Sequence, residues 1–460
     1  MTFSIALANI SARASDFFVD SMLGNDSSPG TLHAPWRTLA RVNSARLGAD
    51  DTVHLRRGRT WREMLVAKRG GVPRHPLTFT SYGHGDQPVI SGSDVVTGWS
   101  PWRPPIYRAA LGAQPGNVYV DGAPSWGLAR ACCLPGAQCS ASRSCSVAEM
   151  RPGSWFFNSR QAALYVWLPD GGSPSARAVE AAVRPAGFYA NVSDDQASNI
   201  VIRGLRIERT AGYGIYFHSY RGRRGLTGVI IERNTVTQTG TGPIDDHRYY
   251  NGIMYLQEPT LDTAPVIAAN TISYTGGHGN GINCQGADHA LIAANNVSYW
   301  NHNGIDVKNS SHVTVTRNVA HDGPNHGAAF YSEHATGIVW MDNTVYRASN
   351  GFQAALGSTA SLGHNSIHDV GTGIYFGPRA AEIVLSHNLI RSARLFFETD
   401  GNGTVRDQDA DWEPQAIFRI GRRTLDLGQW RLRGAAGRSP RFSALPVIGS
   451  PSVVTRTPAQ

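Results

Sequence analysis

Asn-Gly-Ile-Asn-Cys at residues 280–284 and Asn-Gly-Ile-Asp-Val at residues 303–307 are two copies of a phrase that recurs through the middle of the chain. The phrase is a polar residue, a glycine, and then alternating residues typical of a strand. Between Gly214 and Gly377 it returns every 22 to 24 residues, apart from two longer early intervals. The other copies are centred on Gly214, Gly252, Gly327, Gly351 and Gly373. Such a period predicts a solenoid.

A second set of residues keeps the same period. An asparagine followed by a strand with apolar residues recurs at Asn234, Asn270, Asn295, Asn318, Asn343, Asn365 and Asn388. Two strands per coil therefore stay in step. Because each repeat of a solenoid contacts only its neighbours, 460 residues fit one elongated domain.

The composition is that of a turn-rich β protein. The chain has 50 Gly but only 5 Cys and 6 Met. No stretch has the roughly 18 consecutive apolar residues of a membrane span, so we expect no membrane partner. A net charge of +8 attracts polyanions such as nucleic acids, acidic lipids and acidic polysaccharides. Charge alone does not choose among these partners. A basic protein of this kind can also bind none of them.

Residues 1–14 resemble a degraded signal peptide, because Ala12-Arg13-Ala14 suits the rule of small residues around the cleavage site. This predicts a secreted or periplasmic protein, with cytoplasmic residence as the alternative. Four cysteines crowd one Gly/Ser-rich loop, where they predict disulfides in an oxidising compartment or, alternatively, a zinc site. They are Cys132, Cys133, Cys139 and Cys145. We expect Cys284 to be a plain core residue.

The segment from residue 16 to residue 100 carries Ala-Pro-Trp-Arg-Thr-Leu at 34–39 and Asp-Thr-Val-His-Leu-Arg at 51–56. A short helix around residues 36–45 followed by brief strands is expected here. This pattern resembles the N-terminal cap and first coils of secreted right-handed parallel β-helix proteins, the pectate-lyase-like superfamily. The resemblance implies an all-β, right-handed parallel β-helix with an N-terminal cap helix.

The pattern divides the chain into segments. Residues 15–100 form the cap and first coils, and residues 101–198, which are rich in Trp and Pro, form an inserted β-rich segment. Residues 199–397 are the main coils with the active site, and residues 398–460 are a last coil and an extended tail.

Strand alternation directs the residues one and three after each glycine inward, and those two and four after it outward to solvent. Neighbouring coils lie about 4.8 Å apart, so outward residues form columns. Counting from each glycine predicts one column of Gln285, Lys308 and Tyr331, beside a second of Asn283 and Asp306.

This outward patch brings a candidate base, a phenol and a carboxylate near one sugar unit, although any β-helix exposes polar residues. His278, His302 and His326 lie in flanking turns, and His302 and His326 are best placed for proton transfer. A long insertion that contains Arg248 and Tyr250 is expected to overhang the patch and bind substrate, as are Glu333, Gln285 and His278.

The stretch Gly304-Ile-Asp-Val-Lys-Asn, with Val313 to Asp322 after it, is similar to the catalytic coil of mannuronan C5-epimerases. Asp306 matches the aspartate of that motif, whereas Lys308 and Asn309 stand where the family has histidine and glutamate. Lysine is the base implied by resemblance to β-helix polysaccharide lyases. The sequence therefore predicts a lyase that cleaves a uronic-acid polysaccharide by β-elimination, with C5-epimerisation as an alternative.

Elimination needs a group that neutralises the uronate carboxylate, a base and an acid. Asn283, an arginine or a Ca²⁺ ion at Asp306 could supply the first. Lys308 or a histidine could be the base, and Tyr331 or His326 the acid. Because a free Asp306 favours charged Lys308, either Asp306 and Asn283 bind Ca²⁺, or Lys308 is the neutraliser and Tyr331 or a histidine is the base.

Two other classes stay open. A β-helix glycoside hydrolase would use paired carboxylates, for which the candidates are Asp245, Asp246, Glu258, Asp306 and Glu333. A protein that only binds glycans should show rows of outward aromatic residues, and Tyr216 and Tyr375 alone are few and far apart. The expected partner is an acidic polysaccharide and not a nucleic acid.

Overall fold

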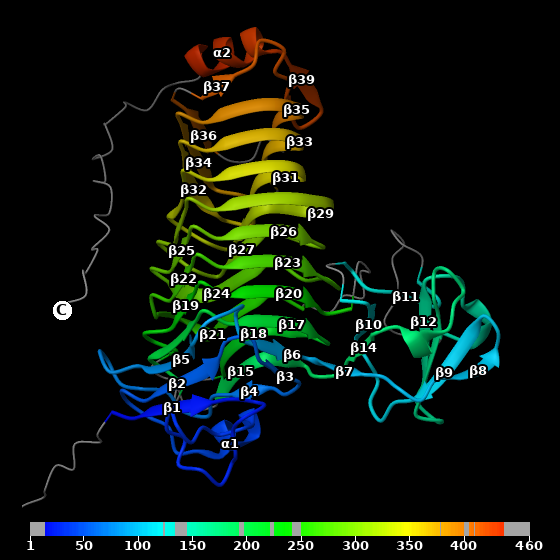
Figure 1. Ribbon diagram of the computed structural model, residues 1–460. Helices are drawn as coiled ribbons and strands as arrows, with labels where there is room; N and C mark the ends of the chain where they lie inside the picture. Colours follow the sequence, from blue (N-terminus) through cyan, green and yellow to red (C-terminus); the bar gives the residue numbers. More distant parts are fainter. Residues whose placement is uncertain are drawn as a thin grey trace, which may run out of the picture.

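The computed structural model describes residues 14–122, 125–133, 145–192, 197–220, 225–241, 250–377, 379–399, 404–408 and 410–436. Parallel strands wind into a tall stack of coils, from which a smaller β unit projects near the N-terminal end (Figure 1). The fold is therefore all-β and solenoidal, as the repeat predicts. In these described residues no helix is long and apolar enough to cross a membrane.

One face of the stack is a sheet of twelve parallel strands. They are β1 (Asp16–Val19), β2 (Thr52–Arg56), β5 (Leu77–Tyr82), β16 (Ile200–Arg203), β19 (Ile230–Glu232), β22 (Val266–Ala268), β25 (Leu291–Ala293), β28 (Thr314–Thr316), β30 (Ile338–Met341), β32 (Thr359–Gly363), β34 (Glu382–Ser386) and β36 (Thr404–Asp407). The predicted asparagines precede the next strand of each coil.

Two more rows of parallel strands complete the coils. One row is β3 (Thr60–Trp61), β6 (Val89–Ser91), β17 (Arg206–Thr210), β20 (Thr235–Thr239), β23 (Thr271–Thr275) and β26 (Asn296–Trp300). The other is β4 (Leu65–Val66), β15 (Ala186–Val192), β18 (Tyr213–Tyr220), β21 (Ile253–Asp262), β24 (Ile282–Asp288) and β27 (Ile305–Lys308). The later strands bend to serve both rows: β29 (Val319–Glu333), β31 (Thr344–Ala355), β33 (Ser366–Phe376) and β35 (Leu389–Thr399).

The asparagine series forms a continuous ladder inside the stack. From Asn270 onward, each buried side chain accepts hydrogen bonds through Oδ1 from the backbone N–H and the Nδ2 of the asparagine one coil earlier. Asn318, for example, accepts from Asn295 and donates to Asn343 Oδ1 at 3.0 Å. The residue before each asparagine is left-handed, with φ of 54° at Arg317. The ladder thus satisfies backbone groups that a sharp turn would leave unpaired.

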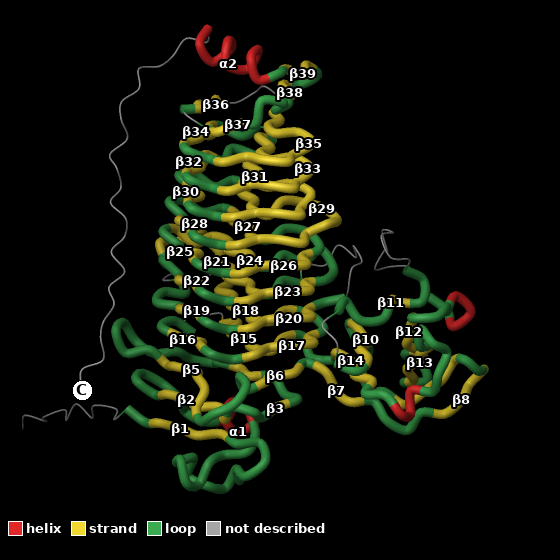
Figure 2. The backbone as a smooth tube through the Cα atoms, turned by 45° about the horizontal axis from the view of Figure 1, so that its top comes forward, coloured by secondary structure: helices red, strands yellow, loops and turns green. Residues whose placement is uncertain are grey.

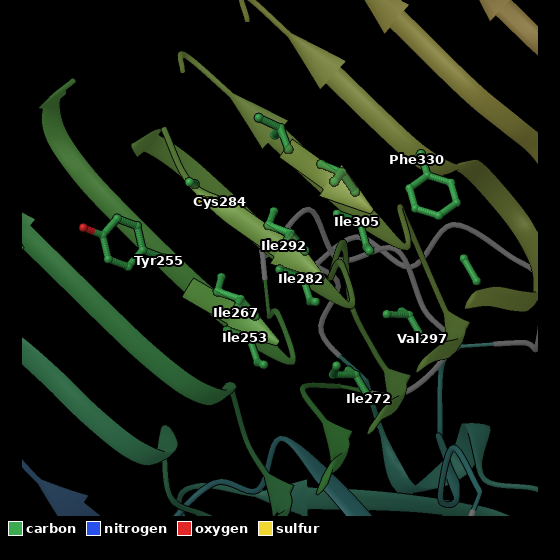
Figure 3. Close-up of a cluster of buried hydrophobic side chains, with 14 of the residues drawn as sticks. Ile253, Tyr255, Ile267, Ile272, Ile282, Cys284, Ile292, Val297, Ile305 and Phe330 are labelled. Atoms are coloured by element: carbon green, nitrogen blue, oxygen red, sulfur yellow. The ribbon is translucent and has the colours of Figure 1, made fainter. Parts of the chain in front are cut away.

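The interior is filled by the residues that the phrase directs inward. Ile253, Ile282 and Ile305 stack over one another, with Cys284 and Phe330 in the same layer of buried side chains (Figure 3). The prediction that Cys284 is a core residue is confirmed, since its side chain is fully buried. The phrase glycines permit close contact between coils: a Cβ at Gly304 would lie 2.5 Å from Ala329 O.

One copy of the phrase is out of register with the count from glycines. Ile305 pairs with Phe330, so Ala329 and not Gly327 occupies the position of Gly304. The backbone irregularity between Gly323 and Ala328 adds residues to β29, and Gly327 adopts a left-handed φ of 71° there. Gly327 therefore belongs to this irregular stretch of backbone. The prediction that it occupies the phrase-glycine position is wrong by two residues, because Ala329 lies there.

Both ends of the stack are closed by helices. α1 (Leu39–Ser44) lies within the helix predicted around residues 36–45, and it buries Leu39 and Val42 at the N-terminal end. At the other end β37 (Asp411–Trp412), β38 (Phe418–Ile420) and β39 (Arg423–Leu425) lead into α2 (Leu427–Ala436). Helix α2 lies at the C-terminal end of the stack (Figure 1). Its Trp430 stacks on Phe418 with ring centroids 4.6 Å apart. The sequence pattern did not predict this second helix.

The projecting unit contains two small sheets (Figure 2). They are built from β7 (Ser93–Val95), β10 (Asn117–Val120) and β14 (Val179–Ala182), and from β8 (Ser100–Arg103), β9 (Ile106–Ala110), β11 (Ala129–Arg130), β12 (Ser154–Asn158) and β13 (Ala163–Trp167). Tyr119 Oη donates to Gln238 O at 3.1 Å and so joins this unit to the coils. A disulfide links Cys132 to Cys145 within the predicted cysteine cluster, whereas Cys139 lies outside the described residues.

Candidate functional site

The outward residues of β24, β27 and β29 form two adjacent columns. Asn283, Asp306 and Tyr331 pair in succession in one column. Gln285, Lys308 and Glu333 pair in succession in the other. Tyr331 was predicted beneath Lys308, and it lies beneath Asp306 because β29 is two residues out of the expected register. Glu333 takes the place expected for Tyr331, so the centre has two carboxylates.

Asp306 is held by amides from two coils. Its Oδ2 accepts from Asn280 Nδ2 at 3.0 Å, from Asn283 Nδ2 at 3.3 Å and from Asn303 Nδ2 at 3.4 Å. Asn280 and Asn303 are the polar residues that open the repeated phrase. The phrase therefore supplies the carboxylate and two of the donors that fix it.

Asp306 and Asn283 do not face solvent as the alternation predicts. Their exposed fractions are 0% and 4%, because Asn280, Asn303 and Lys308 close around the carboxylate. Loss of hydration raises the pKa of Asp306 to about 6, and the Lys308 ammonium and the Asn303 amide oppose this rise. Asp306 can therefore carry a proton near neutral pH.

Lys308 bridges the two carboxylates. Its Nζ lies 3.5 Å from Asp306 Oδ2 and 3.2 Å from Glu333 Oε2. Tyr331 Oη donates to Glu333 Oε2 at 3.2 Å, and Lys308 Nζ lies 5.5 Å from the centre of the Tyr331 ring. Lys308 and Glu333 keep about a fifth of their side chains exposed, at 19% and 23%. A bound molecule could reach the site from this side.

Two oxygens in the site lack a protein partner. Asp306 Oδ1 and Asn283 Oδ1 are buried, and neither has a hydrogen bond within the part of the chain that the structure describes. Buried acceptors without a partner are uncommon and costly in native proteins. They mark the place where the hydroxyl of a ligand, or a proton on the carboxyl group itself, would satisfy the site.

Two of the predicted histidines, His278 and His302, lie beside the amides that hold Asp306. His302 Nδ1 lies 3.1 Å from Asn280 Oδ1 and 3.0 Å from Asn303 Nδ2, and its ring packs against His278 at 3.8 Å. His302 thus contacts the amides that hold Asp306. The side chain of His326 lies outside the described residues.

Of the remaining predicted residues, only Gln285 lies in this centre among those that the structure describes. Arg248, Asp245 and Asp246 lie outside the described residues. Glu258 acts electrostatically on His218, on coils nearer the N-terminus. Tyr250 packs edge-on against Tyr213 with ring centroids 6.3 Å apart. Gln285 lies beside Lys308 in the centre.

The donor set does not fit a Ca²⁺ ion at Asp306 and Asn283. Ca²⁺ binds six to eight oxygen ligands. Here the Lys308 ammonium lies against both neighbouring carboxylates and three amide N–H groups point at Asp306 Oδ2. Across the described ranges no three His, Cys, Asp or Glu side chains group as metal ligands.

The likeness to known proteins concerns the fold. Residues 251–409 match the family model described as the right-handed β-helix region. No curated protein matches the chain in sequence. The solved complex of XylC with xylose is 15% identical with a TM-score of 0.62, over 88% of this chain and 72% of that chain.

Two further solved structures are similar to the chain. A glycoside hydrolase is 10% identical with a TM-score of 0.59, over 88% of this chain and 96% of that chain. Pectate lyase Pel9A is 12% identical with a TM-score of 0.45, over 86% of this chain and 78% of that chain. The predicted right-handed parallel β-helix is confirmed.

Proposed function

Because the chain has the right-handed parallel β-helix fold of the pectate-lyase-like superfamily, we propose that it is a carbohydrate-active enzyme acting on a polysaccharide. Its catalytic centre is Asp306, Lys308, Tyr331 and Glu333. The observation that carries the proposal is the pair of carboxylates on neighbouring coils joined by one ammonium group.

Hydrolysis of a glycosidic bond is the reaction that this pair supports best. Glycoside hydrolases use one protonated and one ionised carboxyl group, separated by about 5 to 9.5 Å. Asp306 Oδ2 and Glu333 Oε2 both contact Lys308 Nζ, so they lie less than about 7 Å apart. Burial raises the pKa of Asp306 to about 6, which suits the acid.

The hydrogen bonds select the oxygen that carries the acidic proton. Asp306 Oδ2 faces only donors, namely the amides and Lys308, so a proton there would meet other protons. Oδ1 has no donor against it. The proton of a neutral Asp306 therefore sits on Oδ1, and a substrate must reach this buried atom to receive it.

The second carboxylate completes the reaction. Glu333 attacks the anomeric carbon or removes a proton from the attacking water, while Asp306 gives its proton to the departing oxygen. The C–O bond breaks, and the leaving sugar keeps the proton as a hydroxyl. Tyr331 Oη donates to Glu333 Oε2 and orients it, and Lys308 stabilises both carboxylates as their charges change.

β-Elimination of a uronic-acid polymer is the second candidate, and the contacts of Lys308 bear on it. Two carboxylates beside Lys308 favour its charged form. Lys308 would then neutralise the uronate carboxylate, and Tyr331, whose hydroxyl proton Glu333 can accept, would take the C5 proton and protonate O4. However, Glu333 would repel an acidic sugar.

Secretion or a periplasmic location fits this activity. The Cys132–Cys145 disulfide supports an oxidising compartment, in which such bonds persist. We propose an extracellular polysaccharide as the substrate, which would be acidic if the reaction is β-elimination.

One experiment tests both reactions. The protein is incubated with neutral and uronate-containing polysaccharides while reducing ends and the ultraviolet absorbance of a C4=C5 double bond are followed together. Reducing ends without absorbance support hydrolysis, and absorbance supports elimination. Full activity in both Glu333→Gln and Lys308→Ala would remove this centre from consideration, and a changed epimer ratio without cleavage would indicate epimerisation.

A further inference from the structure

Four tyrosines gather on the coils that precede the catalytic centre, and we name them the tyrosine cluster: Tyr189, Tyr213, Tyr216 and Tyr250. Tyr213 and Tyr216 stack with centroids 4.3 Å apart and planes at 10°. Tyr189 packs against Tyr216 at 5.5 Å, and Tyr250 meets Tyr213 edge-on at 6.3 Å. All four side chains are half-buried. Tyr213 and Tyr216 both lie on β18, whereas Tyr189 of β15 and Tyr250 come from the coils on either side, so the fold brings the cluster together.

A buried histidine fixes the orientation of the cluster. His218 Nδ1 lies 2.7 Å from Tyr216 Oη, and His218 is only 6% exposed. Burial lowers the pKa of His218, with Glu258 opposing the shift, so the imidazole is neutral at neutral pH. The groups of the cluster and its histidine are therefore uncharged.

The cluster lies in line with the catalytic centre. Tyr216 pairs with Met254, Met254 with Asn283, and Asn283 with Asp306, all in the same outward column. Three coil steps separate Tyr216 from Asp306, which is about 14 Å. A single sugar bound at Asp306 could not reach Tyr216. An extended glycan could, by lying over the half-buried Leu256 and Gln285, which form the neighbouring column beside the buried Met254 and Asn283.

We propose that the tyrosine cluster is a glycan subsite that binds an uncharged pyranose ring of a chain whose scissile bond lies at Asp306 and Glu333. A tyrosine offers an apolar ring to the C–H face of a sugar and a hydroxyl to its oxygens. The position on the catalytic column makes a glycan the occupant. This inference rests on the proposed function and adds that the substrate is an oligomer or polymer extending toward the N-terminal coils.

Binding without turnover tests the subsite. In the inactive Glu333→Gln protein, calorimetry compares xylohexaose, cellohexaose and mannohexaose with their disaccharides. At least one hexasaccharide should bind roughly tenfold more tightly than its disaccharide, and Tyr213→Ala or Tyr250→Ala should remove that gain without weakening the disaccharide. Tyr299→Ala, which removes a half-buried tyrosine stacked on Tyr274 in another row of strands, is the matched control and should change neither.

The outcomes separate this inference from the proposed function. A tyrosine-dependent gain without turnover by the wild-type protein keeps the subsite and overturns the enzyme proposal. Turnover of long glycans with an unchanged KM in Tyr213→Ala and Tyr250→Ala overturns the subsite alone. The subsite is also overturned if none of the three hexasaccharides binds, or if only hexagalacturonate, added as an acidic comparison, binds. Melting temperatures show whether Tyr213→Ala and Tyr250→Ala are folded. Either variant alone is enough for the test if the other one misfolds.

Discussion

Lys308 Nζ lies 3.2 Å from Glu333 Oε2 because the two residues are register partners on adjacent coils. The same ammonium lies 3.5 Å from Asp306 Oδ2 on its own strand. One cation therefore couples a fully buried carboxyl group to a half-buried carboxylate. The chemistry of the site depends on this shared contact.

Glu333→Gln should lower kcat by about a thousandfold, because an amide can neither attack the anomeric carbon nor accept a proton from water. Tyr331→Phe keeps the carboxylate but removes its donor, and should cost roughly tenfold to a hundredfold. Release of reducing sugar measures both. Tyr375→Phe, in the same column beyond Tyr331 and Gln353, is the control and should keep its activity. Equal activity of Glu333→Gln and wild type would contradict the assignment.

The pH profile should have an alkaline limb set by Asp306. With its pKa raised to about 6, the proton needed for leaving-group departure is lost above that pH, and kcat/KM falls about tenfold per unit. Lys308 lowers this pKa, so Lys308→Met should move the limb to higher pH while reducing the rate. A limb that stays in place in Lys308→Met would show that another group titrates.

Asp306→Asn should stabilise the protein at alkaline pH. The folded pKa of about 6 exceeds the usual 3.8, so the folded state binds more protons and loses stability as pH rises through this window. Above pH 6 the ionised wild type bears a penalty of about 3 kcal/mol that the asparagine variant lacks. The melting temperature difference between variant and wild type should therefore grow between pH 4 and pH 8. A constant difference would argue against the raised pKa.

Asn318→Ala should lower the free energy of unfolding by about 3 kcal/mol, since it leaves the N–H groups of Asn295 and the carbonyl of Ile292 unpaired inside the stack. Denaturant titration measures the change. Asn296→Ala removes an exposed asparagine that contacts His321, and should cost under about 0.5 kcal/mol. Similar losses of unfolding free energy in the two variants would show that the asparagine ladder does not stabilise the stack.

The repeat in the sequence predicted most of the fold. Two periodic signals, the phrase and the asparagines, define the coil independently, and Asn295 and Asn318 lie on successive coils as their spacing predicts. The helix at Leu39–Ser44 was also predicted from its surroundings. Periodicity is informative here because each coil repeats the same contacts.

The site was harder to predict, since it depends on an irregularity. The residues inserted between Gly323 and Ala328 move Tyr331 and Glu333 two positions along the strand from where the repeat predicts them. No periodic signal in the sequence shows how many residues are inserted. The prediction therefore grouped the right strands but placed Tyr331 where Glu333 lies. Ala329, whose Cβ occupies a position normally held by glycine, was the available hint.

The tyrosine cluster and the burial of Asp306 were also missed. Tyr213 precedes its phrase glycine, and Tyr189 lies on a strand before the recognised coils, so the column count from glycines included neither. Burial of Asp306 arises from side chains on two coils that close over it, and strand alternation gives only direction.

The asparagine ladder is also a one-way array of dipoles. Each asparagine from Asn234 to Asn365 donates one Nδ2 hydrogen to Oδ1 of the asparagine on the following coil, so these amides polarise one another along the solenoid axis. Replacing an asparagine in the middle of the ladder would split this array into two shorter ones. Replacing Asn388, the final member, would only shorten it. The wall of the solenoid is thus electrically oriented between Asn234 and Asn388, and the middle coils of that stretch are the ones that gain most from their neighbours.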